Sequence, residues 1–305
     1  PDPEFRMKIE KEMPYVKWGA RKAVLNDLSP AATFIAANYN MPVDVQEFEK
    51  EAKRILKECE KECGWMYETL HTDGDGETNR YIDGKPIKGR INYVVWSDVF
   101  VCPNCSGEIV FWNAAVDKEK GKVKDSFRCS HCRSELKKRD CDRASEIIYD
   151  KALKKNITMA KQVPVLINYS VGKKRYEKAP DEYDLDILRR IDEMDIPYWY
   201  PTNEIPKGEK TVEPIRLGIT HAHHFYTKRT IACIAKIIGE SKNNTIMWLI
   251  TAVSEGSSKL NRERPHGLPS KLSGTLYISS MIREINVIDF IKRKAQKYIS
   301  IAKRL

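Results

Sequence analysis

Apolar residues recur every three or four positions over residues 43–67, and glutamates and lysines fill most of the positions between them. This spacing puts the apolar side chains on one face of a helix, which we expect to end near Gly64. The same periodicity predicts further helices at 185–194, 228–238, 244–253 and 287–304. Helices therefore account for much of the expected structure.

Alternation of apolar and polar residues predicts strands elsewhere. The stretch "INYVVWSDVF", 91–100, alternates well enough for a strand, and "QVPVLINYSVGKKRYEKAPDEYD", 162–184, predicts a strand, a Gly-Lys turn and a basic strand. The segment 71–89 is rich in Asp-Gly turns. A calcium loop at Asp73, Asp75 and Glu77 is disfavoured because the remaining ligand spacing is absent. The expected fold class is α+β.

The segment "VLNDLSPAATFIAANYN", 24–40, predicts a strand ending at Asp27 and a helix with Ser29 as N-cap and Pro30 at its first position. This order is typical of the second strand and helix of a nucleotide-binding α/β sheet. An acid at that strand end can accept hydrogen bonds from ribose hydroxyls, although it can equally cap the turn before the helix. Residues 1–6 precede the first methionine and are interpreted as a vector remnant.

The composition limits the class of protein, its compartment and its partners. The chain of 305 residues is 41 % hydrophobic, has no apolar run of membrane-spanning length, and shows neither an internal repeat nor a secretory segment. Its net charge of +10 favours polyanionic partners. Eight cysteines, four of them in two close pairs, suggest metal ligation in a reducing compartment. We therefore expect a soluble, cytoplasmic protein without a membrane partner.

The two close pairs carry the strongest motif. "CPNC" supplies Cys102 and Cys105, and "CSHC" supplies Cys129 and Cys132. Each Cys-x-x-Cys knuckle aims two thiolates at one ion, and Zn²⁺ prefers four such donors in a tetrahedron. The sequence therefore predicts a zinc ribbon with a structural zinc ion, since a closed site leaves no position for chemistry. His131, inside the second knuckle, is not needed as a ligand.

The other metal-ligating residue types are interpreted differently. Cys59, Cys63, Cys141 and Cys233 have no matching partner spacing, so ordinary thiols are expected there. His221, His223 and His224 come from one short loop without a carboxylate or a fourth donor at a supporting spacing. We therefore expect polar contacts or packing for these histidines rather than a metal.

Basic and aromatic residues gather in three segments. Their side chains suit phosphate contact and base stacking, although a solvated hairpin, a mobile loop and aromatic packing within the domain are the alternatives. The candidate DNA-binding residues are Lys173, Lys174, Arg175, Lys178, Tyr198, Trp199, Arg262, Arg264 and Lys271.

Five segments, in this order, resemble the zinc-ribbon-containing, adenine-specific DNA methyltransferases of restriction and phage-defence systems. They are "RKAVLNDLSPAATFIA", "INYVVWSDVFVCPNCSGEIVFWNAAV", "PYWYPTNEIP", "HHFYTKRTI" and "LSGTLYISSMIREINV". In such enzymes a glycine-rich loop that binds S-adenosylmethionine precedes the strand ending at the position of Asp27. An Asn/Asp-Pro-Pro-Tyr/Phe motif, which holds the target amino group, would follow the position of Leu305. Neither motif is in this sequence.

The resemblance implies the middle part of such an enzyme, inactive alone, in which Asp27 contacts S-adenosylmethionine only in the intact parent. The implied parts are a vector remnant (1–6), the edge of a Rossmann-like methyltransferase domain (7–41), a helical and turn-rich connector (42–90), the zinc ribbon (91–140), a DNA-recognition region (141–225) and a helical region returning to the methyltransferase core (226–305). The implied partners are double-stranded DNA, the missing N- and C-terminal parts, and restriction or defence-system proteins. The alternative is a stand-alone zinc-ribbon module that binds nucleic acid or protein.

Overall fold

The computed structural model describes residues 2–19, 24–40, 42–72, 81–117, 119–242, 244–265 and 267–303. The chain forms two compact units, Pro1–Pro42 and Val43–Leu305. Helices and strands are both well represented, which confirms the α+β class. The three residues weighed for calcium, Asp73, Asp75 and Glu77, lie outside the described residues.

The first unit contains helices α1 (Pro3–Glu12) and α2 (Pro30–Asn40). The predicted start of α2 is confirmed: Pro30 is its first residue, and Ser29 Oγ accepts a hydrogen bond of 3.4 Å from the backbone N–H of Ala32. The strand expected before it is not formed, because residues 24–27 have no regular secondary structure. Asp27 instead accepts the backbone N–H of Ser29 at 2.7 Å and so caps the turn.

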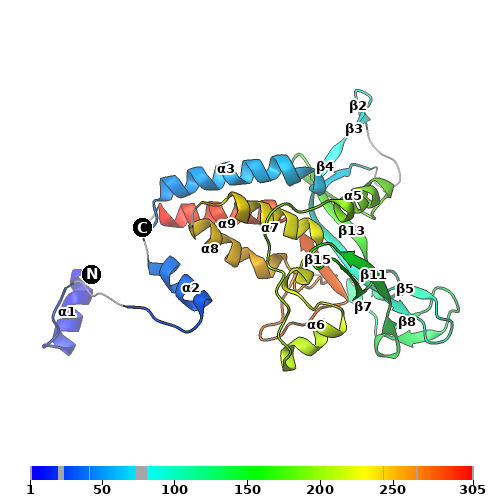
Figure 1. Ribbon diagram of the computed structural model, residues 1–305, viewed down its shortest axis with the longest axis horizontal. Helices are drawn as coiled ribbons and strands as arrows, with labels where there is room; N and C mark the ends of the chain where they lie inside the picture. The colour runs from blue at the N-terminus through cyan, green and yellow to red at the C-terminus, as the bar shows by residue number, and fades with distance from the viewer. Residues whose placement is uncertain are drawn as a thin grey trace. The chain divides into compact units, whose positions relative to one another are not determined.

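The second unit is organised around one long strand, β4 (Lys88–Val101), as Figure 1 shows. Strands β13 (Gln162–Val171) and β15 (Met281–Ile285) both pair with residues 93–97 of β4 and therefore flank it on opposite edges. All pairings in this sheet are antiparallel. The other strands of the sheet are β1 (Glu68–Leu70), β5 (Glu108–Val110) and β10 (Asp142–Arg143) on β4, and β14 (Lys174–Lys178) on β13.

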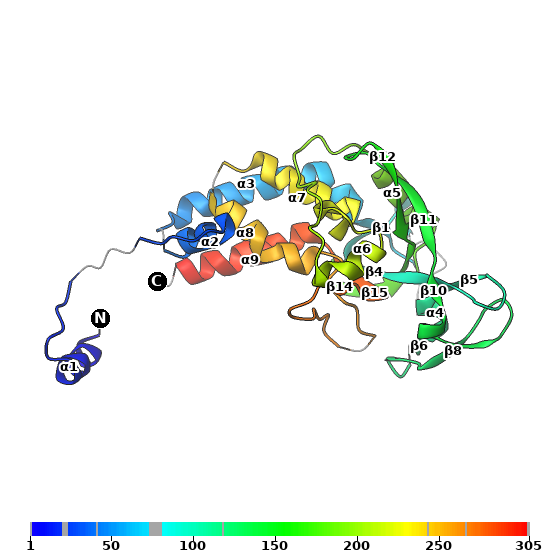
Figure 2. The ribbon, with the colours of Figure 1, turned by 60° about the horizontal axis from the view of Figure 1, so that its bottom comes forward.

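Four helices cover one face of this sheet and lie alongside one another in Figures 1 and 2. They are α3 (Val45–Cys63), α7 (Lys228–Glu240), α8 (Asn244–Ser254) and α9 (Val287–Ala302). Their buried isoleucines and valines pack against Ile91 and Val94 of β4. The next residue, Val95, belongs instead to the ribbon core, because adjacent strand residues point to opposite faces. Within the described part of the chain, no helix is long and apolar enough to cross a membrane.

Short elements complete the unit. Four hairpins are formed by β2 (Tyr81–Ile82) and β3 (Lys85–Pro86), β6 (Val116–Asp117) and β7 (Lys122–Val123), β8 (Ser126–Arg128) and β9 (Glu135–Lys137), and β11 (Ser145–Asp150) and β12 (Lys155–Ala160). The remaining α-helices are α4 (Phe111–Ala115), α5 (Glu182–Glu193) and α6 (Val212–Arg216). Single 3₁₀ turns are η1 (Gly64–Tyr67), η2 (Lys138–Asp140), η3 (Glu209–Thr211), η4 (Ala222–Phe225) and η5 (Glu255–Ser257).

A buried ion pair ties the helices to the sheet. Arg229 of α7 lies 2.5 Å from Glu284 of β15, and both side chains are almost fully buried. Glu284 also accepts the indole N–H of Trp96 at 2.8 Å, and Arg229 donates to the carbonyl of Met66 at 2.8 Å. Burial raises the pKa of the Glu284 carboxyl, but Arg229 outweighs this and holds the pKa below its usual value. One pair thus fixes α7, β15, β4 and η1 together.

We expect Arg229→Met to lower the free energy of unfolding by about 3–5 kcal/mol, because it leaves the Glu284 carboxylate buried without its counter-charge. Arg189→Met is the matched control, since Arg189 pairs with Glu182 and Asp186 on an exposed helix face and its loss should change the free energy of unfolding far less. Urea unfolding measures both. Equal losses in the two variants would contradict this account of the core.

Candidate metal centre and basic surface

The first cysteine knuckle is a direct continuation of the central strand. Cys102 follows the last residue of β4, and β5 folds back to pair with residues 99–101. The second knuckle is the turn between β8 and β9, which pair from Ser126–Lys137 to Arg128–Glu135. Both pairs of thiols are therefore held at the ends of antiparallel hairpins.

The two knuckles share one backbone conformation. The N–H of Ser106 donates to the carbonyl of Cys102 at 2.9 Å, and the N–H of Arg133 donates to that of Cys129 at 3.0 Å. Ser106 and Arg133 occupy the same place in their turns and have φ values of 59° and 64°, in the left-handed region. This repeated turn directs both cysteines of each knuckle toward the same point.

The four sulfur atoms have the spacing of a tetrahedral metal site. Sγ of Cys102 lies 3.7 Å from that of Cys132, and Sγ of Cys105 lies 3.7 Å from that of Cys129. A tetrahedron with zinc–sulfur bonds of about 2.3 Å has edges of about 3.8 Å. All four ligand atoms lie within 4.8 Å of one another. The predicted ligand set is therefore brought together in a site that is compatible with structural zinc.

Neighbouring groups support the thiolates without joining them. His131 Nε2 lies 3.0 Å from the carbonyl oxygen of Glu108 and donates to it, and this histidine is not part of the four-sulfur cluster. The ring closely covers Gly107, where an added Cβ would lie 2.5 Å from His131 Cδ2. The Ser134 hydroxyl lowers the pKa of the Cys132 thiol to about 6, which favours its thiolate. At Cys105 the backbone N–H of Gly107 is outweighed by desolvation and by the other thiols, which raise the pKa to about 12, so a metal ion must displace that proton.

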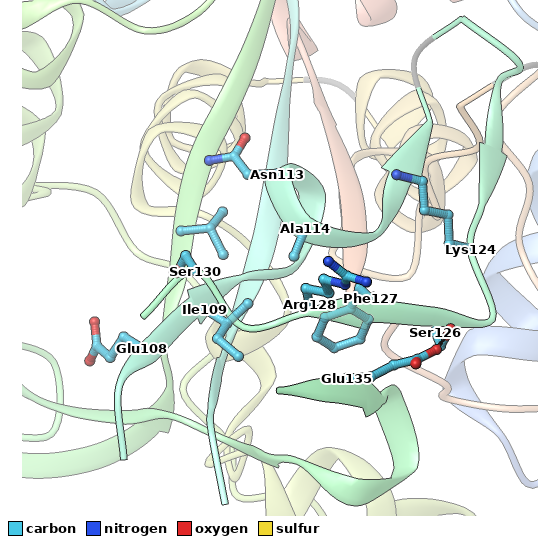
Figure 3. A pocket seen from close by; sticks show the side chains of 11 residues that line it. Glu108, Ile109, Asn113, Ala114, Lys124, Ser126, Phe127, Arg128, Ser130 and Glu135 are labelled. Carbon is cyan, nitrogen blue, oxygen red and sulfur yellow. Dashed lines mark hydrogen bonds between the residues drawn. The ribbon is translucent and has the colours of Figure 1, made fainter. Parts of the chain in front are cut away.

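The ribbon also carries a pocket of about 610 Å³, shown in Figure 3. Its apolar part is formed by Ile109 and Phe127, and its polar part includes the exposed side chains of Asn113, Lys124 and Arg128. No ion pair or hydrogen bond to another described residue engages these three polar side chains. This pocket could not be predicted from the sequence, because its lining residues come from two separate segments, 108–114 and 124–135.

The turn between β13 and β14 presents three cations. Lys173, Lys174 and Arg175 are exposed, and among the described residues no carboxylate pairs with any of them. Lys178 is different: its Nζ is buried and lies 2.6 Å from Asp181 Oδ2 and 2.9 Å from Asp184 Oδ2.

The prediction that Lys178 contacts DNA is therefore wrong. Lys178 pairs across the sheet with Ile167, a core residue, so its side chain points to the helix-covered face. Because successive side chains of a strand point to opposite faces, Arg175, three positions before Lys178, points to the opposite face.

Residues 261–263 lie beside β15 at the far edge of the sheet. Arg262 forms an isolated bridge with Ile282 and is half-buried, whereas Arg264 is exposed. Lys271 lies 2.5 Å from Glu255, so much of its charge is compensated. Of these three predicted contacts, Arg264 is thus the most available to a ligand.

In the aromatic loop, residues 198–200, Tyr198 packs against helices whereas Trp199 is exposed. Tyr198 donates its hydroxyl to Glu62 at 2.9 Å and accepts from Lys236 at 2.8 Å, and the same ammonium lies 4.8 Å from the ring centroid. This corrects the expectation that both rings are open to bases, because Tyr198 is bound to its own helices. Trp199 remains 68 % exposed. Among the described residues, no hydrogen bond, ion pair or ring contact joins Trp199 to either basic segment.

Asp27 does not fit the cofactor role that the resemblance implies. It is exposed, follows no strand in the described residues 24–27, and uses its carboxylate to cap the turn at Ser29. A ribose-binding acid in a doubly wound sheet must stand at a strand end beside the glycine loop. No step of a methyl transfer is therefore assigned to this chain.

The loop that carries His221, His223 and His224 contacts a carboxylate that could not be predicted from the sequence. Asp150, the last residue of β11, has Oδ2 at 2.9 Å from His223 Nε2 and 2.8 Å from His224 Nε2. The backbone N–H of Thr220 donates to His224 Nδ1 at 3.2 Å. The proton of that neutral ring is therefore on Nε2 and is donated to Asp150. The expectation that no carboxylate supports these histidines is wrong, because the ligand atoms of Asp150, His223 and His224 all lie within 4.8 Å of one another.

No family model matches the sequence, and searches of curated proteins and of solved structures likewise find no match.

We expect one zinc ion per chain in protein purified without chelator, and loss of that zinc in the double variant Cys129→Ser/Cys132→Ser, because two thiolates cannot close the tetrahedron. Cys141→Ser is the control, since it removes a thiol outside the four-sulfur cluster. Elemental analysis measures the content. Zinc that is absent from the wild type or undiminished in the double variant would contradict the assignment.

We also expect stability to fall as the pH drops below about 6.5, the usual pKa of histidine. Burial lowers the pKa of His224 in the folded chain, so the unfolded chain takes up this proton first as the pH falls. Burial raises the pKa of Asp150, but its hydrogen bonds with His224 and His223 outweigh this and lower the pKa to about 2. Protonation of Asp150 therefore reduces the stability further only below about pH 4. Urea unfolding at pH 7.5 and 5.5 should show a smaller pH difference in His224→Gln than in the wild type. His131→Gln is the control, and an equal reduction there would contradict the role given to His224.

Proposed function

We propose that this chain recognises duplex DNA as the zinc-ribbon-containing, target-recognition part of an S-adenosylmethionine-dependent adenine DNA methyltransferase. The observation that carries the proposal is the exposed and uncompensated cation turn Lys173–Arg175 on a sheet that also holds the ribbon. Uncompensated surface cations attract phosphates by releasing bound counterions, whereas cations paired with carboxylates do not.

The sheet supports this proposal through the placement of its cations. The strand order β14, β13, β4 and β15 leaves the Lys173–Arg175 turn on one side and the Arg262–Arg264 segment beyond the other. Cations at two separate places on one sheet can contact phosphates at separate points along a duplex.

The ribbon supplies side chains of the kind that read base edges. Arginine forms bidentate hydrogen bonds with guanine, and asparagine does so with adenine. Arg128, Asn113 and Lys124 all line the same pocket with unpaired polar groups (Figure 3). In the proposed complex the edge cations position the duplex, and the ribbon contributes sequence readout.

Methyl transfer itself belongs to the parent enzyme in this proposal. The chain contributes recognition, because Asp27 does not fit the cofactor role and no catalytic motif is in the sequence. The second candidate is a ribbon module that binds a protein partner. The exposed apolar strand residues Ile147 and Tyr149 are the observation that favours it.

We expect the zinc-loaded chain to bind duplex DNA with a binding constant whose logarithm falls with log salt at a slope of about −4 to −5, as for about four to six phosphate contacts. Charge reversal at Lys173, Lys174 and Arg175 should weaken binding and flatten this slope, because three of those contacts become repulsive. Fluorescence anisotropy at several salt concentrations measures both quantities.

The matched control reverses Lys292, Arg293 and Lys297, three exposed cations on α9 in the helical layer. It changes the net charge equally but leaves the sheet edges unaltered. If the two triple variants lose affinity equally, the binding is diffuse and no recognition surface exists. If the wild type fails to bind at low salt, the protein-interaction module becomes the better account.

A further inference from the structure

Three cysteines outside the ribbon meet in the helical core. Cys59 and Cys63 lie one turn apart on α3, and Cys233 lies on α7. Their sulfur atoms all fall within 4.8 Å of one another, and the three residues are 0 %, 2 % and 0 % exposed. Helical spacing of four puts the first two on one face, and the packing of α7 against α3 brings the third. This cluster plays no part in the proposed DNA contacts.

We propose that Cys59, Cys63 and Cys233 form a three-thiolate site for monovalent copper. Cu(I) is a soft ion that thiolates select. Three sulfurs at about 2.3 Å from one ion lie about 4.0 Å apart when the site is trigonal, within the spread of this cluster. Structural zinc takes a fourth donor, and no other cysteine, histidine or carboxylate of the described residues joins these three.

The surroundings of the cluster suit a closed site. The three sulfurs lie within the main hydrophobic core, among residues such as Ile55 and Ile237, so water is kept from a fourth coordination position. Among the described residues, the one hydrogen bond from these thiols to a backbone group is that from Cys59 Sγ to the Cys233 carbonyl oxygen, at 3.9 Å. The sulfur lone pairs are thus free to face a common ion.

Binding is a ligand exchange without electron transfer. Copper enters as Cu(I), three S–H bonds break, three Cu–S bonds form, and the three protons leave to solvent. The complex then carries two negative charges. Arg229 and Lys236, on the same helix about one turn to either side of Cys233, pair with Glu284 and with Glu62 and Glu240 respectively, so the charge of the complex is set against neutralised pairs rather than free cations. The bound ion would link α3 to α7 inside the helical layer.

The test titrates the zinc-loaded full chain with Cu(I) under anaerobic conditions, in a buffer of a chromogenic Cu(I) chelator, and follows copper uptake and zinc release together. The expected result is one copper per chain with zinc retained. The double variant Cys59→Ala/Cys233→Ala should bind copper at least 100-fold more weakly, while Cys141→Ala should bind it as the wild type does. Circular dichroism and the zinc content report whether each variant is folded.

Equal copper uptake by the wild type and the double variant would overturn the proposal. So would a wild type that takes up copper only as it releases zinc, because the ribbon would then be the binding site. Should the double variant fail to fold, X-ray absorption of the copper-loaded wild type decides the matter. Three sulfur neighbours support the site, and a shell that contains nitrogen or oxygen overturns it.

Discussion

The continuity of β4 is the constraint on which the second unit depends. One strand of 14 residues packs Ile91 and Val94 against the helices, turns Val95 and Phe100 into the ribbon core, and ends one residue before Cys102, the first cysteine of the four-sulfur cluster. Because a strand is stiff and its side chains alternate, the two cores cannot shift independently of one another. The candidate metal centre is therefore a rigid extension of the sheet rather than a tethered module.

This arrangement gives the buried Arg229–Glu284 pair and the ribbon complementary roles. The ion pair fixes the helices to β15 and β4 on one side of the sheet, while the knuckles fix the far end of β4 through β5. Removal of Arg229 would leave the Glu284 carboxylate buried without a counter-charge. Removal of a cysteine from the knuckles would leave the candidate zinc site with too few ligands. The exposed turn Lys173–Arg175 is held by neither the ion pair nor the knuckles, because it contributes charge to the surface rather than packing to a core.

Sequence patterns predicted what depends on local spacing. The knuckles follow from Cys-x-x-Cys, and the helices at 43–67 and 228–238 follow from apolar periodicity, since both are set by residues close in the chain. Contacts between distant segments were not predictable. Asp150 reaches the histidine loop, and Cys233 reaches α3, only because hairpin β11–β12 and helix α7 pack where they do. The role of Lys178 was predicted wrongly because the alternation of side chains along β14 puts Arg175 on one face of the sheet and Lys178 on the other. Asp181 and Asp184 then pair with the buried Lys178 ammonium. The resemblance to adenine-specific methyltransferases stays a prediction.

The central claim is that the edges of one sheet, together with the ribbon fixed to it, form the DNA-binding surface. Photo-crosslinking of the zinc-loaded chain to duplex DNA, read by mass spectrometry, tests this most directly because it locates the contact without altering the protein. The account predicts crosslinked peptides from the β13–β14 turn, from residues 261–265 and from the ribbon around Arg128. Crosslinks confined to the outer faces of α8 and α9, with none in those three segments, would contradict it.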